Sequence, residues 1–254
     1  MPALRVHVLE HAESTPPGTV LDWLKSKGHA ATIVRLWNGD SLPAIEETDW
    51  LILLGGPMNV DQVDEYPWLA EEKLLLKAAV EKKIACLGLC LGGQLLAQAL
   101  GGEVKKNTEW EAGWHTVHFG ATAAPDSRLM VFEWHEDTFT LPPGAVRVAT
   151  NRTSENQGFA FGDRVVGLQF HPEATEDWIR SKIEEGTVMP VGSHVQTREQ
   201  IVDGLIFLTP LKKWFFDLLG RLELIASNHV VAAGGSANLG GGSGAGGGAG
   251  VKKT

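Results

Sequence analysis

The segment 84–97 places a cysteine where a predicted strand gives way to a predicted helix. An apolar run of strand length ends at Leu89, and helix-forming residues resume shortly afterwards. Gly88 and Gly92 flank Cys90 at equal spacing, and the absence of side chains at both positions permits a tight turn. The pattern predicts a nucleophile elbow that exposes Cys90 at its corner. Its sulfur is expected near the N-terminus of the helix, where the helix dipole favours a thiolate.

A structural interpretation of this cysteine competes with the catalytic one. Most free cysteines are small buried hydrophobes. Cys86 lies inside the apolar run and fits that description. The fixed glycine spacing around Cys90 favours the catalytic interpretation for Cys90 and the structural one for Cys86.

Two further segments follow predicted strands in the same way. Gly55-Gly56-Pro57 comes after an apolar strand at 50–54, and His171-Pro-Glu173 comes after a strand at 164–170. In an open α/β sheet the functional crevice lies outside the carboxyl ends of the strands. We therefore expect both segments to lie beside Cys90.

The chemistry of these groups is complementary. His171 can deprotonate a cysteine and later protonate the leaving group, and Glu173 can orient the imidazole. The backbone N–H groups of Gly56 and Leu91 can stabilise an oxyanion. Taken singly, each has a structural alternative: a strand-end histidine, an acid at a helix N-terminus, a turn. The combination with Cys90 predicts acyl transfer from an amide or ester through a thioester.

The elements needed to position these residues are readable in the N-terminal part of the chain. Helices are expected at 19–27, 66–81 and 175–185, and they alternate with strands. This order predicts an α/β fold: an open, mixed but mostly parallel sheet with helices on both faces. The helix at 66–81 is expected to turn Leu69, Leu74, Leu75 and Ala78 inward.

After residue 102 the pattern changes to short strands separated by turns. They are expected at 103–106, 114–119, 130–134, 146–149 and 159–161, and they predict a small antiparallel extension of the sheet.

The C-terminal quarter has a different composition. Apolar residues recur at helical spacing over 198–225, interrupted by Pro210, and we expect this region to pack on the domain rather than form a partner surface. A Gly/Ala/Ser-rich stretch follows. The sequence therefore divides into a domain at 1–190, a helical extension at 191–230 and a low-complexity tail at 231–254.

The composition of the chain limits the classes of partner and the cellular compartment that we expect for it. The 254 residues carry a formal net charge of −9, contain two cysteines, and include no apolar run of membrane-spanning length. We expect no nucleic-acid partner, no membrane association, no metal and no cofactor. Two cysteines and no signal-peptide pattern indicate a cytoplasmic protein.

Several of these motifs resemble one known family, the class I (triad) glutamine amidotransferases. Gly88-Leu-Cys90-Leu-Gly92-Gly-Gln94 is similar to its nucleophile motif, and Gly167-Leu-Gln-Phe-His171-Pro-Glu173 to its second motif. The Trp134-His135-Glu-Asp137 segment resembles members close to the glutaminase domain of GMP synthase. The resemblance spans roughly residues 4–186. It implies that family's flavodoxin-like fold, with Cys90, His171 and Glu173 as catalytic triad.

The resemblance also implies a substrate and a product. Glutamine would be hydrolysed to glutamate and ammonia, with Gly55 and Gln94 binding the substrate and Trp134 and His135 lining the pocket. The ammonia would pass to a separate acceptor synthase. Two alternatives stay open: a γ-glutamyl peptidase that acts on γ-glutamyl conjugates, and a non-catalytic regulatory subunit.

Overall fold

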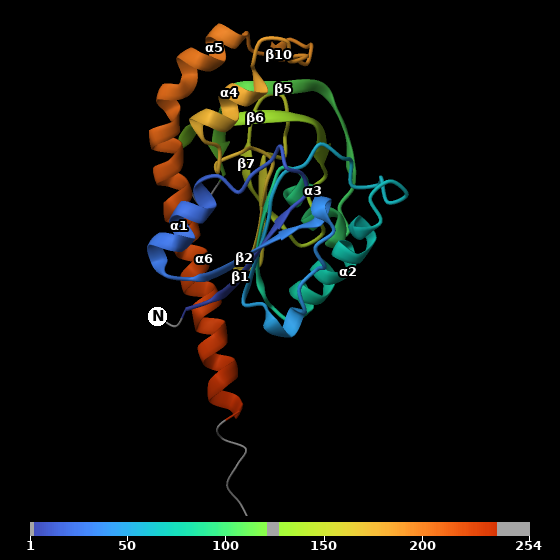
Figure 1. The fold of residues 1–254 in the computed structure, drawn as a ribbon, viewed down its shortest axis with the longest axis vertical. Coiled ribbons are helices and arrows are strands. Elements are labelled where there is room, and N and C mark those ends of the chain that lie inside the picture. Colours follow the sequence, from blue (N-terminus) through green and yellow to red (C-terminus); the bar gives the residue numbers. More distant parts are fainter. Residues whose placement is uncertain (1–2, 121–126, 238–254) are drawn as a thin grey trace, which may run out of the picture.

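The computed structural model of the chain describes residues 3–120 and 127–237. Five parallel strands form one side of a single large sheet, in the spatial order β2–β1–β3–β4–β9, with β2 at the edge. They are β1 Arg5–Glu10, β2 Ala30–Arg35, β3 Trp50–Leu53, β4 Ala85–Leu89 and β9 Val165–Leu168. Figure 1 shows β1 and β2 next to each other. The α/β class and the mostly parallel sheet are confirmed.

An antiparallel part continues the sheet beyond β9. It consists of β8 Gly158–Phe161, β7 Val146–Thr150, β5 Val104–Phe119 and β6 Arg128–Phe139, and the short β10 His194–Val195 pairs with β5 in parallel. The two strands predicted at 103–106 and 114–119 are one strand, because β5 continues across an irregularity in its pairing with β6.

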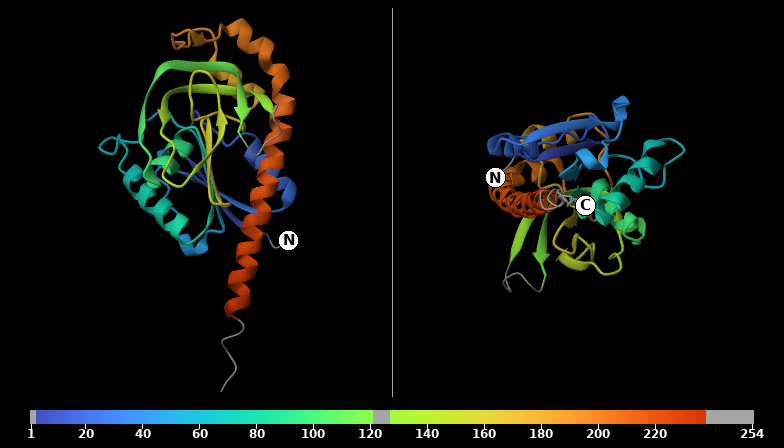
Figure 2. Two further views of the ribbon diagram at one scale, coloured as in Figure 1. Left: turned by 180° about the vertical axis from the view of Figure 1, so that it is seen from behind. Right: turned by 90° about the horizontal axis from the view of Figure 1, so that it is seen from below.

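Helices cover both faces of the parallel strands. On one face lie α1 Thr19–Lys27 and α6 Leu208–Ala237; on the other lie α2 Trp68–Glu81 and α3 Leu91–Ala99 (Figure 2). Alternation along β4 shows why both faces are apolar: Leu87 packs toward α1 and α6, whereas Cys86 packs toward α2 and α3. Two short helices, α4 Glu176–Lys182 and α5 Arg198–Asp203, complete the fold.

Helix α2 corrects the predicted inward face. Leu74 is 67% exposed, and the buried positions are Leu69, Glu72, Leu76 and Ala79. The predicted inward face was wrong because the buried face includes Glu72, and a prediction based on the spacing of apolar residues does not count a glutamate.

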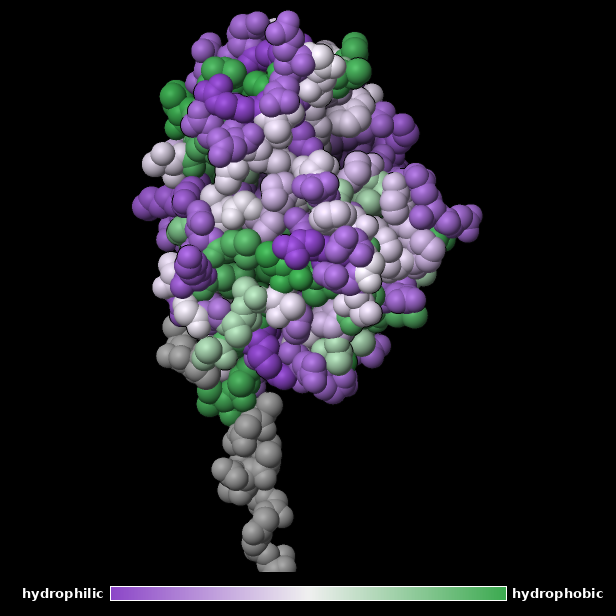
Figure 3. Space-filling view, in the orientation of Figure 1, coloured by the Kyte–Doolittle hydropathy of each residue, from purple (hydrophilic) through white to green (hydrophobic). Residues whose placement is uncertain are grey.

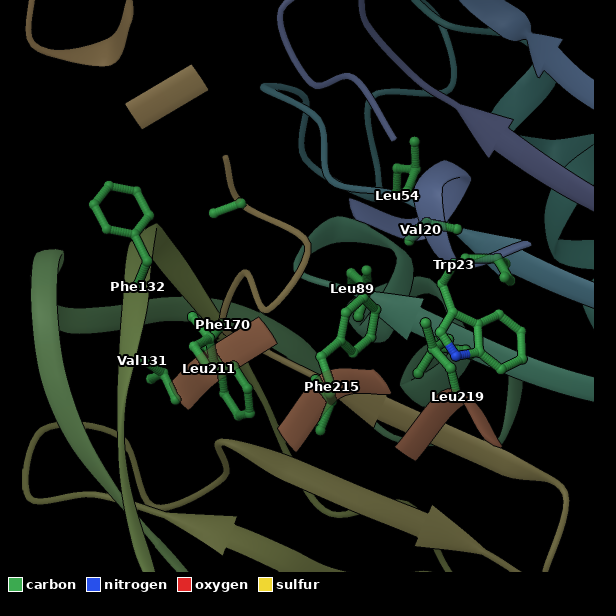
Figure 4. Close-up of a cluster of buried hydrophobic side chains, with 14 of the residues drawn as sticks. Val20, Trp23, Leu54, Leu89, Val131, Phe132, Phe170, Leu211, Phe215 and Leu219 are labelled. Carbon is green, nitrogen blue, oxygen red and sulfur yellow. The ribbon is translucent and has the colours of Figure 1, made fainter. Parts of the chain in front are cut away.

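The C-terminal helical region also differs from the prediction. A 3-10 turn at Gly204–Phe207 separates α5 from α6, and Pro210 lies in the first turn of α6, where a missing N–H is tolerated. Leu211, Phe215 and Leu219 of α6 point into the same core as Leu89 and Phe170 (Figure 4).

The end of α6 lies beyond the predicted end of the helical region. The helix continues to Ala237, and residues 238–254 of the predicted low-complexity tail lie outside the described residues. On the face shown in Figure 3, hydrophilic residues cover most of the body, and hydrophobic residues form separate patches, including one in the middle of the face and one near its lower end. Within the described part of the chain, no helix combines the length and hydropathy needed to cross a membrane.

Candidate active site

Cys90 lies at the sharp turn between β4 and α3. Its backbone has φ 50° and ψ −111°, and its N–H donates to the carbonyl of Leu168 at 2.8 Å. A Cβ at Gly88 would collide with the carbonyl of Gly92, and one at Gly92 would collide with that of Leu53. The predicted glycine-flanked elbow is therefore present in the structure. The expected exposure of the thiol is wrong: Cys90 is only 6% exposed, because the turn lies at the base of a pocket.

The segment after β9 brings His171 and Glu173 to the same place. Nδ1 of His171 lies 2.8 Å from Oε1 of Glu173, and both side chains are buried. Burial lowers the pKa of His171, but the charge of Glu173 and the interactions with Cys90 outweigh it and raise that pKa to about 10. The ring of Trp178 packs against the imidazole with centroids 4.9 Å apart. The geometry thus favours an imidazolium between a carboxylate and the cysteine.

Gly55 and Gly56 follow β3 and lie beside both groups. A Cβ on Gly55 would come within 2.9 Å of Cε1 of His171 and 3.6 Å of Cβ of Cys90. In the described part of the chain, the N–H groups of Gly56 and Leu91 donate to no protein acceptor. Both are therefore available to a bound oxygen.

A pocket of about 230 Å³ opens above the cysteine at the carboxyl ends of the parallel strands. Six of the nine predicted site residues line it. The other three lie outside its wall: Gly55 lies next to His171, Leu91 begins α3, and Glu173 contacts Nδ1 of the imidazole. The lining residues among the predicted set are Gly56, Cys90, Gln94, Trp134, His135 and His171.

Gln169 is a residue near the sulfur that the sequence interpretation missed. Its side chain is fully buried, and Nε2 lies 3.8 Å from Sγ of Cys90. Nε2 of Gln94 donates to Oε1 of Gln169 at 3.3 Å and to the carbonyl of Asp137 at 3.2 Å. Gln169 lies two residues before His171, so the same strand-end position could have identified it.

Helix α4 supplies two more pocket residues that were not predicted, Trp178 and Lys182. Nζ of Lys182 lies 5.2 Å from the Trp178 ring centroid and donates to the carbonyl of Ser14 at 3.1 Å. Burial lowers the pKa of Lys182, and the charge of Cys90 partly opposes this effect. The signal for them was the i, i+4 spacing on the helix that directly follows His171-Pro-Glu173.

His135 belongs to a buried charged cluster next to the pocket. Its Nδ1 donates to the carbonyl of Asp137 at 2.9 Å, and its Nε2 lies 3.2 Å from a carboxylate oxygen of each of Glu111 and Glu133. The pKa of His135 is raised well above the ordinary value, because the two carboxylates outweigh the effect of burial. The ligand atoms of the three groups also lie close enough together to hold a metal ion.

Together these groups can carry out nucleophilic acyl substitution. The pocket provides a thiol, an imidazolium held by a carboxylate, and two free backbone donors near the sulfur. That set matches the requirements for forming and breaking a thioester.

Comparison with known proteins points to one family. The profile of the glutamine amidotransferase class-I family matches residues 19–187. The chain is 29% identical over 199 residues to the glutamine amidotransferase-like protein YfeJ of Salmonella typhimurium, a match that covers 71% of this chain and 80% of that protein. It is 32% identical over 135 residues to one component of the glutamine-hydrolysing GMP synthase of Saccharolobus solfataricus, covering 51% of this chain and 69% of that component.

A solved structure agrees with these matches. The crystal structure of a glutamine amidotransferase from Methylobacillus flagellatus superposes with a TM-score of 0.81 at 28% identity, covering 88% of this chain and 96% of that one. Because 88% of the 254 residues is more than 190 residues, the superposed part includes some of the chain beyond residue 190.

Proposed function

The chain belongs to the class-I glutamine amidotransferase family, and we propose that it is a cysteine-dependent amidohydrolase that converts glutamine to glutamate and ammonia. The observation that carries the proposal is the position of His171, which holds Glu173 at 2.8 Å on Nδ1 and interacts with Cys90 in the same pocket. If His171 had only a structural role, there would be no reason for a cysteine to lie beside it at a turn with strained backbone angles.

The proposed reaction has two halves. The thiolate of Cys90 attacks the side-chain amide carbon of glutamine, and the C–S bond forms as the carbonyl π electrons move to oxygen. The N–H groups of Gly56 and Leu91 stabilise this oxyanion. The C–N bond then breaks, and His171 protonates the departing ammonia.

The second half releases the product. His171 takes a proton from water, the resulting hydroxide attacks the thioester, and collapse of the second oxyanion frees glutamate and the thiolate. Glu173 keeps the imidazole oriented through both halves.

The lining of the pocket supports an amino-acid substrate. Its volume of about 230 Å³ is below the range of about 300–1,000 Å³ that drug-sized ligands occupy. Acidic side chains at Glu136 and Asp137 and the cation of Lys182 can recognise the two charged ends of an amino acid. We assign Gly55 and Gln94 to glutamine binding and Trp134 and His135 to the pocket wall.

A separate chain would receive the ammonia. Support comes from the name of one relative, which is a component of a GMP synthase with more than one chain. Both cysteines are free, so the proposed site needs a reducing compartment such as the cytoplasm. Three tryptophans at the pocket, Trp110, Trp134 and Trp178, keep a γ-glutamyl conjugate as the second candidate substrate, since they could contact a larger leaving group.

The test is glutamate release by the purified full chain from glutamine and from a panel of γ-glutamyl amides and dipeptides. Turnover of glutamine supports the amidotransferase; turnover of conjugates alone supports the peptidase. Labelling of Cys90 by a glutamine-analogue electrophile without turnover indicates a glutaminase that needs its synthase partner. Absence of both turnover and labelling would support the non-catalytic, regulatory alternative, and it would overturn the proposal.

A further inference from the structure

His11 is a buried histidine that the proposed reaction does not use. It follows the carboxyl end of β1, is 0% exposed, and lies behind the pocket rather than in its wall. Nδ1 lies 3.3 Å from the carbonyl oxygen of Gly55, and Nε2 lies 3.0 Å from Oε1 of Glu72. Glu72 is also 0% exposed, and the ring of Trp68 stacks on His11 with centroids 5.6 Å apart.

The contact with Gly55 defines one proton of His11. A carbonyl oxygen only accepts hydrogen bonds, so Nδ1 of His11 carries the proton that faces the oxygen of Gly55. Burial alone would lower the pKa of His11, but the charge and hydrogen bond of Glu72 raise it above the ordinary value. The buried contact with Glu72 holds the His11 ring with its Nδ1–H against the carbonyl of Gly55.

Thr15 supplies a second donor to the same carbonyl. Its hydroxyl, at the edge of the pocket, lies 2.9 Å from the oxygen of Gly55 and 3.1 Å from that of Ala12. When it donates to the nearer oxygen, that of Gly55, this oxygen accepts from two side chains. One donor would already satisfy the hydrogen-bonding requirement of this buried carbonyl oxygen. Two donors also fix the direction in which the oxygen points. That direction matters because Gly55 and Gly56 carry no side chains, which leaves the peptide between them free to rotate.

The planarity of the Gly55–Gly56 peptide determines the direction in which the N–H of Gly56 points. In a trans peptide the C=O and the following N–H point in opposite directions. The oxygen of Gly55 points to the buried His11, so the N–H of Gly56 points to the side where Gly56 lines the pocket with Cys90. A rotated peptide would instead turn a carbonyl oxygen toward a developing oxyanion.

We propose that His11 and Thr15 are positioning residues that hold the Gly55–Gly56 peptide with its N–H directed at the oxyanion site, and that the buried Glu72 holds the His11 ring in place for this role. The catalytic consequence rests on the proposed function, whereas the orientation of the peptide does not.

The kinetic test uses matched threonine variants. Thr15→Val removes the hydroxyl at nearly constant volume and should lower kcat by about tenfold to a hundredfold with little change in KM, because loss of an entire oxyanion donor costs about a hundredfold or more. Thr15→Ser should restore most of the rate. Thr48→Val is the control: its buried hydroxyl also donates to a backbone carbonyl, that of Ala44 at 2.9 Å, but outside the pocket, so kcat should not change.

Two further measurements distinguish a misdirected Gly56 N–H from a general distortion of the active site. Glutamate γ-semialdehyde forms a tetrahedral adduct with a thiol, so its affinity should fall in Thr15→Val by the same factor as kcat. Alkylation of Cys90 by iodoacetamide needs no oxyanion hole and should keep its wild-type rate. Wild-type kcat and wild-type aldehyde affinity in Thr15→Val would overturn the proposal.

Crystal structures provide the test that does not depend on turnover. In Thr15→Val combined with His11→Leu and Glu72→Gln, the Gly55 carbonyl should be rotated or present in two orientations. If this triple variant does not fold, Thr15→Val with Glu72→Leu serves instead. An unchanged Gly55 carbonyl in the folded variant would overturn the positioning role, whereas an inactive wild type that binds no aldehyde would refute only the proposed function.

Discussion

Nδ1 of His171 lies 2.8 Å from Oε1 of Glu173, although only Pro172 separates the two residues in the chain. The pair forms within one short segment after β9, and the pairing of β9 with β4 then brings it to Cys90. A local hydrogen bond and one strand pairing are thus enough to assemble the candidate triad.

Glu173→Gln tests the electrostatic part of this pair. Burial lowers the pKa of His171, and Glu173 is the first of the charges that raise it to about 10. Removing that charge should let His171 lose its proton at lower pH. Because protonated His171 is needed to protonate the departing ammonia, we expect the alkaline limb of the pH dependence of glutamine turnover to shift to lower pH and the turnover rate to fall about 10²- to 10⁴-fold. An alkaline limb that stays at the wild-type pH would show that Glu173 does not control the imidazole.

The two cysteines should react differently with a glutamine-analogue electrophile. Burial raises the pKa of Cys86 to about 12, and its thiol is 0% exposed, so it stays protonated at pH 8. Peptide mapping by mass spectrometry should find the label on Cys90 alone. Cys90→Ala should abolish labelling and turnover, and Cys86→Ala should keep both. Loss of turnover in a folded Cys86→Ala protein would reverse the assignment.

The positive φ of Cys90 predicts a stability difference between two inactive variants. A non-glycine residue at φ 50° and ψ −111° is strained, whereas glycine adopts such angles without penalty. Cys90→Gly should therefore have a free energy of unfolding about 1–2 kcal/mol higher than Cys90→Ala. Urea denaturation measures this difference. Equal or lower stability of the glycine variant would mean that the turn relaxes when the thiol is removed.

Glu133→Gln should stabilise the protein at alkaline pH. Burial raises the pKa of Glu133 to about 7, so its ionisation is disfavoured in the folded state and stability falls as pH rises from about 4.5 toward 7. In the glutamine variant this loss disappears, which should make it about 1–3 kcal/mol more stable than wild type at pH 8 and nearly equal at pH 5. Urea denaturation at both pH values provides the measurement.

Glu111→Gln is the matched control for that prediction. The carboxylate of Glu111 accepts hydrogen bonds from Asn151 at 2.6 Å and Gln157 at 2.9 Å. Burial raises the pKa of Glu111, but His135 and the bond from Asn151 outweigh it and lower that pKa. Its replacement should destabilise the protein at pH 8. Equal effects of the two substitutions would show that the cluster does not distinguish its carboxylates.

Phe215→Ala tests whether α6 contributes to the hydrophobic core of the domain. Phe215 is fully buried in the same cluster as Leu89, the last residue of β4 before Cys90 (Figure 4). The variant should lose about 3–5 kcal/mol of unfolding free energy. Ile206→Ala is the control, because Ile206 is 75% exposed and should change stability by less than about 0.5 kcal/mol. A mild effect of Phe215→Ala would indicate that α6 docks loosely on the domain.

The sequence by itself determined those features that depend on neighbours along the chain. Alternating strands and helices, the glycine-flanked turn at Cys90 and the His171-Pro-Glu173 segment are all local patterns. They were sufficient to predict the α/β fold and to bring distant segments to one sheet edge, because carboxyl ends of parallel strands meet there.

Only the tertiary structure decided which charged residues are buried. The rotation of α2 about its axis places Glu72 inward against His11 and Leu74 outward, and the register of β5 against β6 places Glu111 opposite His135. From the sequence alone, a glutamate is expected at an exposed position, because burying an unpaired charge costs free energy. Its partner is tens of residues away, and the burial becomes favourable only once packing has brought the two together.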